Sequence, residues 1–564
     1  MAGHRKTAAP ASPKPLTHAN RAIISPILLY IATGALHGAL SQLMLSPVYG
    51  SIVSSEYHDK VTLTACLLGS VFSMFSSSMD APLLRLRVWI SVLPFYFPVV
   101  SAFLFPYSQD LGSNWGPLTT EVLTLGPFHF TFSAYIGALL SADYRVFKNQ
   151  RILHFAVVFA ISQIIMRLEP FLLESLPNLA LQSTYLTRLW LSLAVSTTGL
   201  TQTSVLGALA AIPAISHTLQ RNPHLEWRPI RALPALEQAG YSLIDRKESI
   251  TGYISVLENN ELSYRVLRCD HSLLGGEWLL TDSAISRGIT GTEPVYAVFE
   301  MLEAVRLVDS AKKPRDKDST ALVIGLGIGT APKALLAHGI DTTIVELDPV
   351  VHEFATKYFD LPTNHSSYLE DAVGWTRSRV SRGVTPYDYI LHDVFTGGAE
   401  PLALFTESFI TNLRTLLKPE GVIAINYAGS VISQPAKQVL NTINIVFEGR
   451  CRIFRDLVPE EDDDDFSNMV IFCLNPAASN KHQKPVFRKP VEADFLSSVS
   501  RRTQLVPNPK LEITFPSKEE MEVEAVQTLT EANMGSFSRQ QMSNAKKHWE
   551  VMRQVVYPSV WEMW

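Results

Sequence analysis

Cysteine is scarce in this chain of 564 residues. No Cys-x-x-Cys pair and no Cys/His spacing typical of zinc is present, so we expect neither a metal site nor a disulfide framework. Free buried thiols in a reducing compartment are the prediction for such scattered cysteines. An excess of positive charge is also missing, because 48 basic residues face 53 acidic ones, and nucleic acid is therefore not an expected partner. The four cysteines are Cys66, Cys269, Cys451 and Cys473.

Charge is nearly absent from six stretches in the first 220 residues, while the rest has an ordinary soluble composition. A helix that spans a bilayer needs about 20 apolar residues, and five of the six stretches meet this length. We therefore predict a basic disordered tail (1–21) and a helical membrane domain (22–217) with about six spans. The stretches lie between Arg21 and Glu56, then at Val61–Met79, Val88–Tyr107, Val122–Ala142, Ile152–Met166 (the short one) and Leu189–Ile215.

Along this half, loops that are rich in basic residues alternate with loops that are poor in them. Because positive charge marks the cytoplasmic side, the pattern predicts a multi-pass integral membrane protein with both termini cytoplasmic. The alternative is a buried helical domain of a soluble protein. The spans contain no row of carboxylates that would mark an ion path, and His37, His129 and His154 fall in three different spans.

The second half contains a glycine-rich turn between two apolar runs. Ala321–Ile324 leads into Gly325, Gly327 and Gly329, and a second run ends on Glu346. This is the βαβ pattern of a nucleotide-binding sheet, in which glycines allow a close ligand approach and an acid can accept bonds from ribose hydroxyls.

Further acids fall at the predicted ends of later strands. Asp371 ends a short third strand and Asp393 follows the fourth. Ligands of open α/β sheets sit at the carboxyl ends of strands, so these residues predict one binding edge. The predicted division is a linker (218–247), a small antiparallel β domain and helix (248–310), a Rossmann-like domain (319–476) and a C-terminal extension (477–564). The acidic run Glu460–Asp465 is interpreted as a solvated loop.

Several segments together resemble the spermidine/spermine synthase family, within the class I S-adenosylmethionine-dependent transferases. They include VIGLGIGT, TTIVELDPVV, YILHDVFTGG and LFTESF. The resemblance covers about 248–474 and implies S-adenosylmethionine or its decarboxylated form as cofactor. It further implies that Gly325, Gly327 and Gly329 line the methionine side, that Glu346 binds the ribose and that Asp371 contacts the adenine amino group. Members are commonly dimeric, so a homodimer is expected.

The chain departs from the family pattern where an aminopropyl group would be handled. Ile328 replaces the aspartate that holds the aminopropyl amine, and Thr396 replaces the second acid of the catalytic loop. Asp393 matches the first acid, and we expect it to act with His392 and Tyr296. Threonine and isoleucine cannot hold cationic amines or take up a proton as carboxylates do.

Three functions stay open at this point. The first is a membrane-anchored transferase that moves a methyl or aminopropyl group to a small-molecule acceptor such as a polyamine. The second is a true polyamine aminopropyltransferase whose second acid is Glu400, a few residues along the same loop. The third is a catalytically silent nucleotide-binding scaffold of the membrane.

Overall fold

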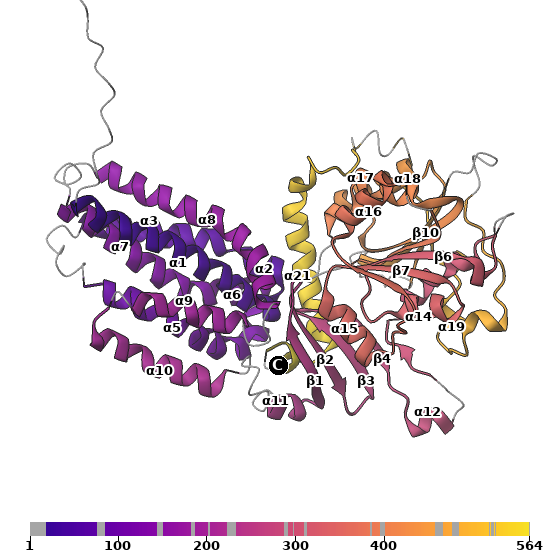
Figure 1. Ribbon diagram of the computed structural model, residues 1–564, viewed down its shortest axis with the longest axis horizontal. Coiled ribbons are helices and arrows are strands. Elements are labelled where there is room, and N and C mark those ends of the chain that lie inside the picture. Colours follow the sequence, from indigo (N-terminus) through magenta and orange to yellow (C-terminus); the bar gives the residue numbers. More distant parts are fainter. Residues whose placement is uncertain are drawn as a thin grey trace, which may run out of the picture.

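The computed structural model shows a helical bundle beside an α/β unit (Figure 1). The bundle is built from described residues between 18 and 222, and the described part of the α/β unit begins at residue 233. The described residues are 18–75, 85–143, 151–181, 187–200, 203–222, 233–286, 291–296, 298–309, 313–383, 386–394, 401–456, 466–475, 484–517, 519, 524 and 526–562. The acidic run Glu460–Asp465 lies outside them.

Long helices build the bundle, and three segments of its described residues are long and apolar enough to cross a membrane: Ile24–Tyr49, Arg87–Leu140 and Phe155–Leu179. The weakly predicted span at 152–166 is part of one 31-residue helix. The helices are α1 (His18–Tyr49), α2 (Ser51–Ser55), α3 (His58–Phe75), α5 (Arg87–Leu104), α6 (Ser108–Leu123), α7 (Leu125–Asp143), α8 (Arg151–Leu181), α9 (Arg188–Leu200) and α10 (Val205–Arg221).

The last predicted span is two helices rather than one. After α9 ends at Leu200, Ser204 caps α10 by accepting a hydrogen bond from the Gly207 amide. Ser, Thr and Gly between the two apolar runs favour such a cap over a continuous helix. The stretch that we predicted to cross once therefore runs away from its starting point and returns.

The ends of these helices fix the direction of the chain. The Pro47 carbonyl near the end of α1 accepts a bond from Arg268 of the α/β unit at 2.7 Å, and Arg188 at the start of α9 bonds Glu248. Thus α1 runs toward the α/β unit, α9 leads away from it, and α10 comes back. The bundle begins at its far end and finishes next to the α/β unit.

Three ionisable side chains meet inside the bundle. The His58 ring lies between Glu121 at 2.7 Å and Glu169 at 3.0 Å, and all three are at most 2% exposed. The sequence does not predict this cluster, because both glutamates lie just outside the charge-free stretches. Helices α6 and α8 extend past those limits and carry the two acids into the interior.

An antiparallel sheet opens the α/β unit, with strands in the order β1-β2-β3-β4-β5. Its first strand lies partly inside the segment that we assigned to a linker. The helix predicted after this sheet is a short α-helix, α13 (Val298–Met301), followed by a 3-10 helix at Leu302–Leu307. The strands are β1 (Tyr241–Glu248), β2 (Tyr253–Asn259), β3 (Tyr264–Cys269), β4 (Ser272–Trp278) and β5 (Glu293–Pro294).

The second sheet is the predicted doubly wound one, in the order β13-β11-β12-β10-β9-β6-β7-β8. The five consecutive strands β10, β9, β6, β7 and β8 are parallel, so their carboxyl ends meet at one edge. The strands are β6 (Thr320–Ile324), β7 (Asp341–Glu346), β8 (Ser366–Leu369), β9 (Tyr387–His392), β10 (Leu417–Ser430), β11 (Cys451–Arg455), β12 (Phe466–Leu474) and β13 (Glu512–Ile513).

Helices cover both faces of this sheet and form two separate apolar clusters (Figure 1). The parallel strands are therefore buried on both sides, which explains their continuous apolar runs in the sequence. The helices that follow the strands are α14 (Thr330–Ala337), α15 (Pro349–Tyr358), α16 (Ala372–Ser381), α17 (Glu407–Thr415) and α18 (Gln434–Val446).

One cysteine prediction is wrong. Cys451 and Cys473 form a disulfide, whereas Cys66 and Cys269 are free and buried. The pairing follows from strand register, because Cys451 lies directly opposite Cys473 in the antiparallel pair β11–β12. A separation of 22 residues in the sequence does not reveal that register.

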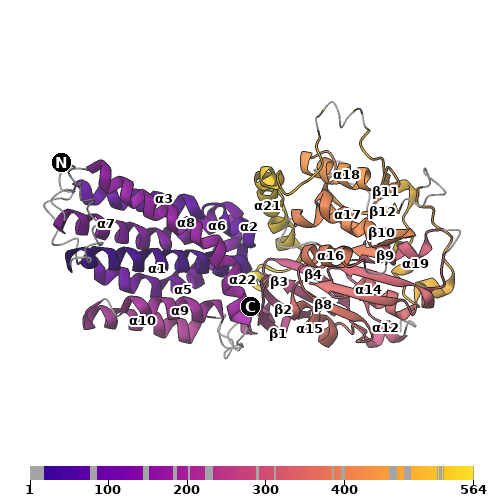
Figure 2. The ribbon, with the colours of Figure 1, turned by 45° about the horizontal axis from the view of Figure 1, so that its top comes forward.

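The C-terminal extension returns to the junction of the two units, as α21 (Ser538–Val555) and α22 (Pro558–Glu562) (Figures 1 and 2). The Trp549 indole donates to the Val48 carbonyl at 3.0 Å, and its ring stacks against both Tyr49 and His271. The segment thus fastens α1 to the antiparallel sheet.

Candidate functional site

A cavity of about 380 Å³ lies at the carboxyl edge of the parallel strands. Three parts of the fold form its walls: the strand ends, the turns of the antiparallel sheet, and Ser51 of the helical bundle. The lining residues are Ser51, Ile250, Thr251, Cys269, Asp270, Leu273, Leu274, Phe299, Ile324, Gly325, Leu326, Gly327, Val345, Glu346, Leu347, Val351, Glu370, Asp371, Ala372, Asp393, Val394, Pro401 and Leu404.

Two of the predicted glycines form a cradle that no larger residue could form. Gly325 and Gly327 have φ of 84° and 55°, in the left-handed region. A Cβ would lie 2.0 Å from the Asp393 carbonyl oxygen at Gly325 and 2.5 Å from the Leu274 carbonyl oxygen at Gly327. Gly329 has φ of 80° and precedes the first residue of α14, but it does not line the cavity.

Glu346 ends β7 and presents a nearly buried carboxylate to the cavity, with 9% of the residue exposed. Burial raises the pKa of this carboxyl to about 7, and the Asp348 amide donates to its Oε1 at 2.8 Å. A buried carboxylate that still has acceptor capacity fits a ligand with neighbouring hydroxyls, since two hydroxyl donors satisfy its remaining lone pairs.

Asp393 follows β9 and also lines the cavity. The Asn426 side chain donates to its Oδ1 at 2.9 Å. Burial raises the pKa of Asp393 to about 6, and the bond from Asn426 acts in the opposite direction. Asn426 was not among the predicted site residues. The signal for it was its position one residue beyond Ile425, which pairs with His392 in the parallel register.

Asp371 lines the cavity and caps a helix as well. Its carboxylate accepts the Val373 amide at 3.3 Å and the Gly374 amide at 3.0 Å, at the start of α16. These bonds fix the carboxylate next to the cavity. The predicted contact with an adenine amino group stays a prediction.

The other two predicted catalytic residues do not line the cavity. Because side chains alternate along β9, the His392 side chain lies on the other face of the sheet from its neighbour Leu391, where its ring contacts Phe405. Burial lowers the pKa of His392 to about 4. The buried Tyr296 hydroxyl has no hydrogen-bond partner among the described residues, and burial raises its pKa to about 12. The structure therefore brings together Asp393, Glu346, Asp371 and two glycines, without His392 or Tyr296.

Ile328, which replaces the expected aspartate, is 3% exposed and belongs to the apolar core. A Cβ at Gly275 would lie 2.9 Å from its Cγ1, so the side chain packs tightly against β4. This part of the loop therefore offers no charge to a ligand amine. Thr396 and the alternative acid Glu400 lie outside the described residues.

Comparison with known proteins finds sequence relatives of this chain. Residues 299–472 match the Spermine/spermidine synthase domain family. The N-terminal histidine N-methyltransferase of Emericella nidulans is 40% identical over 562 residues, which cover 96% of this chain and 97% of that protein. The polyamine aminopropyltransferase of Vibrio vulnificus is 36% identical over 114 residues, 20% of this chain and 38% of that protein. A probable spermidine synthase of known structure, from Corynebacterium glutamicum, is 15% identical, with a TM-score of 0.37 over 51% of this chain and 96% of that chain.

Proposed function

Because the chain belongs to the family of the N-terminal histidine N-methyltransferase of Emericella nidulans, we propose that it methylates the amino-terminal histidine of a polypeptide. Membership confirms the expected transferase activity, with S-adenosylmethionine or its decarboxylated form as cofactor. Within that pair, we propose S-adenosylmethionine. The acceptor in this proposal is a polypeptide rather than a polyamine.

The observation that carries the choice of methyl transfer is that Ile328 is an apolar core residue at the position where an aminopropyl amine would need a carboxylate. An aminopropyl transfer needs acids that hold cationic amines on the cofactor and the acceptor. The apolar Ile328 gives the cofactor none, whereas Asp393 supplies one carboxylate with a pKa of about 6. One base with a pKa close to that of imidazole suits a histidine acceptor.

The described residues divide the work of such a site. When bound, S-adenosylmethionine would supply an electrophilic methyl carbon on its sulfonium; a ring nitrogen of the acceptor would form a bond to that carbon as the C–S bond breaks and S-adenosylhomocysteine leaves. Glu346 would accept hydrogen bonds from the ribose hydroxyls. The backbone at Gly325 and Gly327 would allow the cofactor to approach it closely. Asp393, held by Asn426, accepts the N–H of the acceptor ring, orients the ring and takes its proton. Positioning of the two reactants provides most of the rate in such a displacement.

We further propose that the bundle crosses a bilayer and anchors the enzyme. Three segments of the described residues have the required length and apolarity, which supports a bundle that spans the bilayer. The number of spans, predicted as about six, stays a prediction. Because α1 starts at the far end of the bundle and α10 returns to the α/β unit, we place the basic N-terminal tail on the cytoplasmic side and the α/β unit on the other. The expectation that both termini are cytoplasmic stays a prediction and is the alternative to this orientation. The disulfide in the α/β unit supports it, since disulfides persist in oxidising compartments.

Topology and assembly can be measured directly. Single cysteines that replace residues in the N-terminal tail and on the surface of α18, in intact microsomes, should differ in labelling by an impermeant maleimide. Equal labelling of both positions would contradict the proposed orientation. The expected homodimer stays a prediction, and the mass of the protein in nanodiscs tests it.

Methyl transfer is tested with the full-length protein in lipid nanodiscs. We expect incorporation from methyl-labelled S-adenosylmethionine into a peptide that begins with histidine. The same peptide beginning with alanine and the variant Asp393→Asn should give little or no product. Putrescine and decarboxylated S-adenosylmethionine are the substrates of the competing reaction, aminopropyl transfer. Product from this pair, with none from the histidine peptide, would contradict the proposal and favour aminopropyl transfer.

A further inference from the structure

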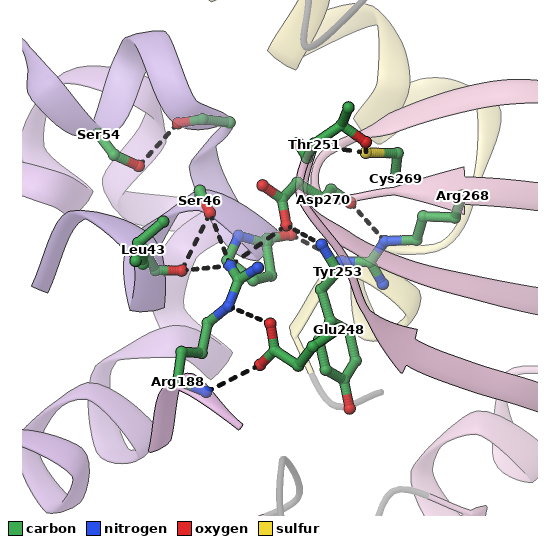
Figure 3. A network of polar contacts seen from close by, with 12 residues as sticks. Leu43, Ser46, Ser54, Arg188, Glu248, Thr251, Tyr253, Arg268, Cys269 and Asp270 are labelled. Carbon is green, nitrogen blue, oxygen red and sulfur yellow. Dashed lines mark hydrogen bonds and ion pairs between the residues drawn. The ribbon is translucent and has the colours of Figure 1, made fainter. Parts of the chain in front are cut away.

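A buried polar network joins the helical bundle to the wall of the cavity (Figure 3). Arg188, the first residue of α9, donates to Glu248 Oε2 at 2.7 Å and to the Leu43 carbonyl at 2.5 Å. Its Nη1 also lies 3.1 Å from Ser46 Oγ and 3.5 Å from Asp270 Oδ1. The bundle thus holds two acids of the antiparallel sheet in fixed positions.

Asp270 is the member of this network that reaches the cavity. It lies in the turn between β3 and β4, lines the cavity and is 6% exposed. Its Oδ1 accepts the Tyr253 amide at 2.8 Å besides facing Arg188. Its Oδ2 accepts no hydrogen bond from the described part of the chain. Because Asp270 is only 6% exposed and lines the cavity, a donor group of a bound ligand can satisfy this oxygen where bulk water has little access.

The bundle also contributes to the cavity directly. Ser51 of α2 lies in its wall together with Asp270. The half of the cavity built by the turns and the bundle is therefore distinct from the half built by the strand ends, which carries Glu346, Asp371 and Asp393. The strand-end half has the predicted cofactor residues, and the other half remains for the acceptor.

We propose that Asp270 binds the ammonium group at the amino terminus of the acceptor, and that Arg188 is the positioning residue that holds Asp270. This inference rests on the proposed function. An amino-terminal histidine has two donor groups, the ring and the α-ammonium. Asp393 binds the N–H of the ring, and Asp270 binds the ammonium group through a charge-assisted hydrogen bond. An internal or acetylated histidine lacks this cation, so the arrangement explains selection of the terminal residue.

The test compares a histidine peptide with its des-amino analogue, in which hydrogen replaces the α-amine, on full-length protein in nanodiscs. We expect the analogue to raise the KM of the native enzyme by about 10- to 100-fold, the loss of one hydrogen bond to a charged group. Asp270→Asn should raise the KM of the peptide similarly and abolish discrimination against the analogue. The affinity for S-adenosylmethionine, measured by calorimetry, should not change.

Arg188 is tested through its effect on Asp270. Arg188→Gln should raise the peptide KM, and its effect should not add to that of Asp270→Asn, because both act on one contact. Arg188→Lys should restore part of the loss. Arg452→Gln is the matched control, since Arg452 pairs with Glu512 at the far strands of the large sheet and should leave KM unchanged.

Two results would overturn the inference. The first is a native enzyme that methylates the des-amino analogue as well as the peptide. The second is an Asp270→Asn variant that still discriminates between them. If the native enzyme methylates neither peptide while its fold and cofactor binding are intact, the proposed function itself fails, and this inference with it.

Discussion

Asn426 controls the acidity of Asp393, so replacing it should move the pH dependence of turnover. Its amide donates to Asp393 Oδ1 at 2.9 Å, and this bond lowers a pKa that burial raises to about 6. A hydrogen bond to a charged group is worth about 1.5–3 kcal/mol, and one pKa unit corresponds to about 1.4 kcal/mol. Asn426→Leu, which keeps the shape and removes the donor, should therefore raise the pKa of Asp393 by about one unit or more.

The sign of the effect follows from the role of Asp393. The carboxylate acts in its ionised form, so turnover decreases as the pH falls through its pKa. In the native enzyme the acid limb of kcat should lie near the pKa of about 6, and in Asn426→Leu it should lie at higher pH. At high pH the two enzymes should become similar.

The assay is methyl transfer at saturating peptide and cofactor over a range of pH, since kcat then reports groups of the bound complex. Asn441→Leu is the matched control. Asn441 lies on α18, and its side-chain amide donates to the Val526 carbonyl at 3.1 Å instead of to Asp393. An acid limb that does not move, or that moves to lower pH, would refute the role given to Asp393 and Asn426.

Three more predictions concern the cradle, the ribose carboxylate and the bundle. Gly327→Ala should abolish cofactor binding in calorimetry, because its Cβ would lie 2.5 Å from the Leu274 carbonyl oxygen; retained affinity would show that the loop can open. Glu346→Gln should weaken cofactor binding about tenfold or more, the loss of charge-assisted bonds to hydroxyls, and native affinity in this variant would contradict its assignment. His58→Ala should lower the free energy of unfolding by about 3 kcal/mol in detergent, because it leaves two buried acids without their partner; an unchanged unfolding midpoint would show that these acids are neutral or solvated.

The cofactor half of the site could be predicted because its signals are local. Glycines follow directly on an apolar run, and the acids lie at the end of a strand or within two residues of it, so both signals can be seen in a short stretch of sequence. Since parallel strands end at a common edge, Glu346 and Asp393 could be brought together without knowing any contact. The same local reading placed His392 beside Asp393, but one step along a strand turns a side chain to the other face.

The remaining features depend on register or on distant packing. Asn426 and the pair Cys451–Cys473 required the alignment of strands that no sequence spacing reveals. Arg188 directly precedes the charge-free stretch Leu189–Ile215, and nothing local shows that it bonds Asp270, which follows 82 residues later. Hydropathy could not separate α9 from α10, because uncharged polar residues join two apolar runs.

The return of α21 to the junction has a consequence for biosynthesis. Trp549 meets Val48 across 501 residues, so the bundle leaves the ribosome long before its fastening segment exists. At roughly 5–20 residues per second, translation of that interval takes on the order of 25–100 s. During this time nothing from α21 joins the antiparallel sheet to α1. A chain that stops before Trp549 would also lack Met552, Val556 and Val560, which belong to the apolar cluster of that sheet. It would therefore be released with an incomplete sheet core and a weakened junction, which makes it a target for quality control.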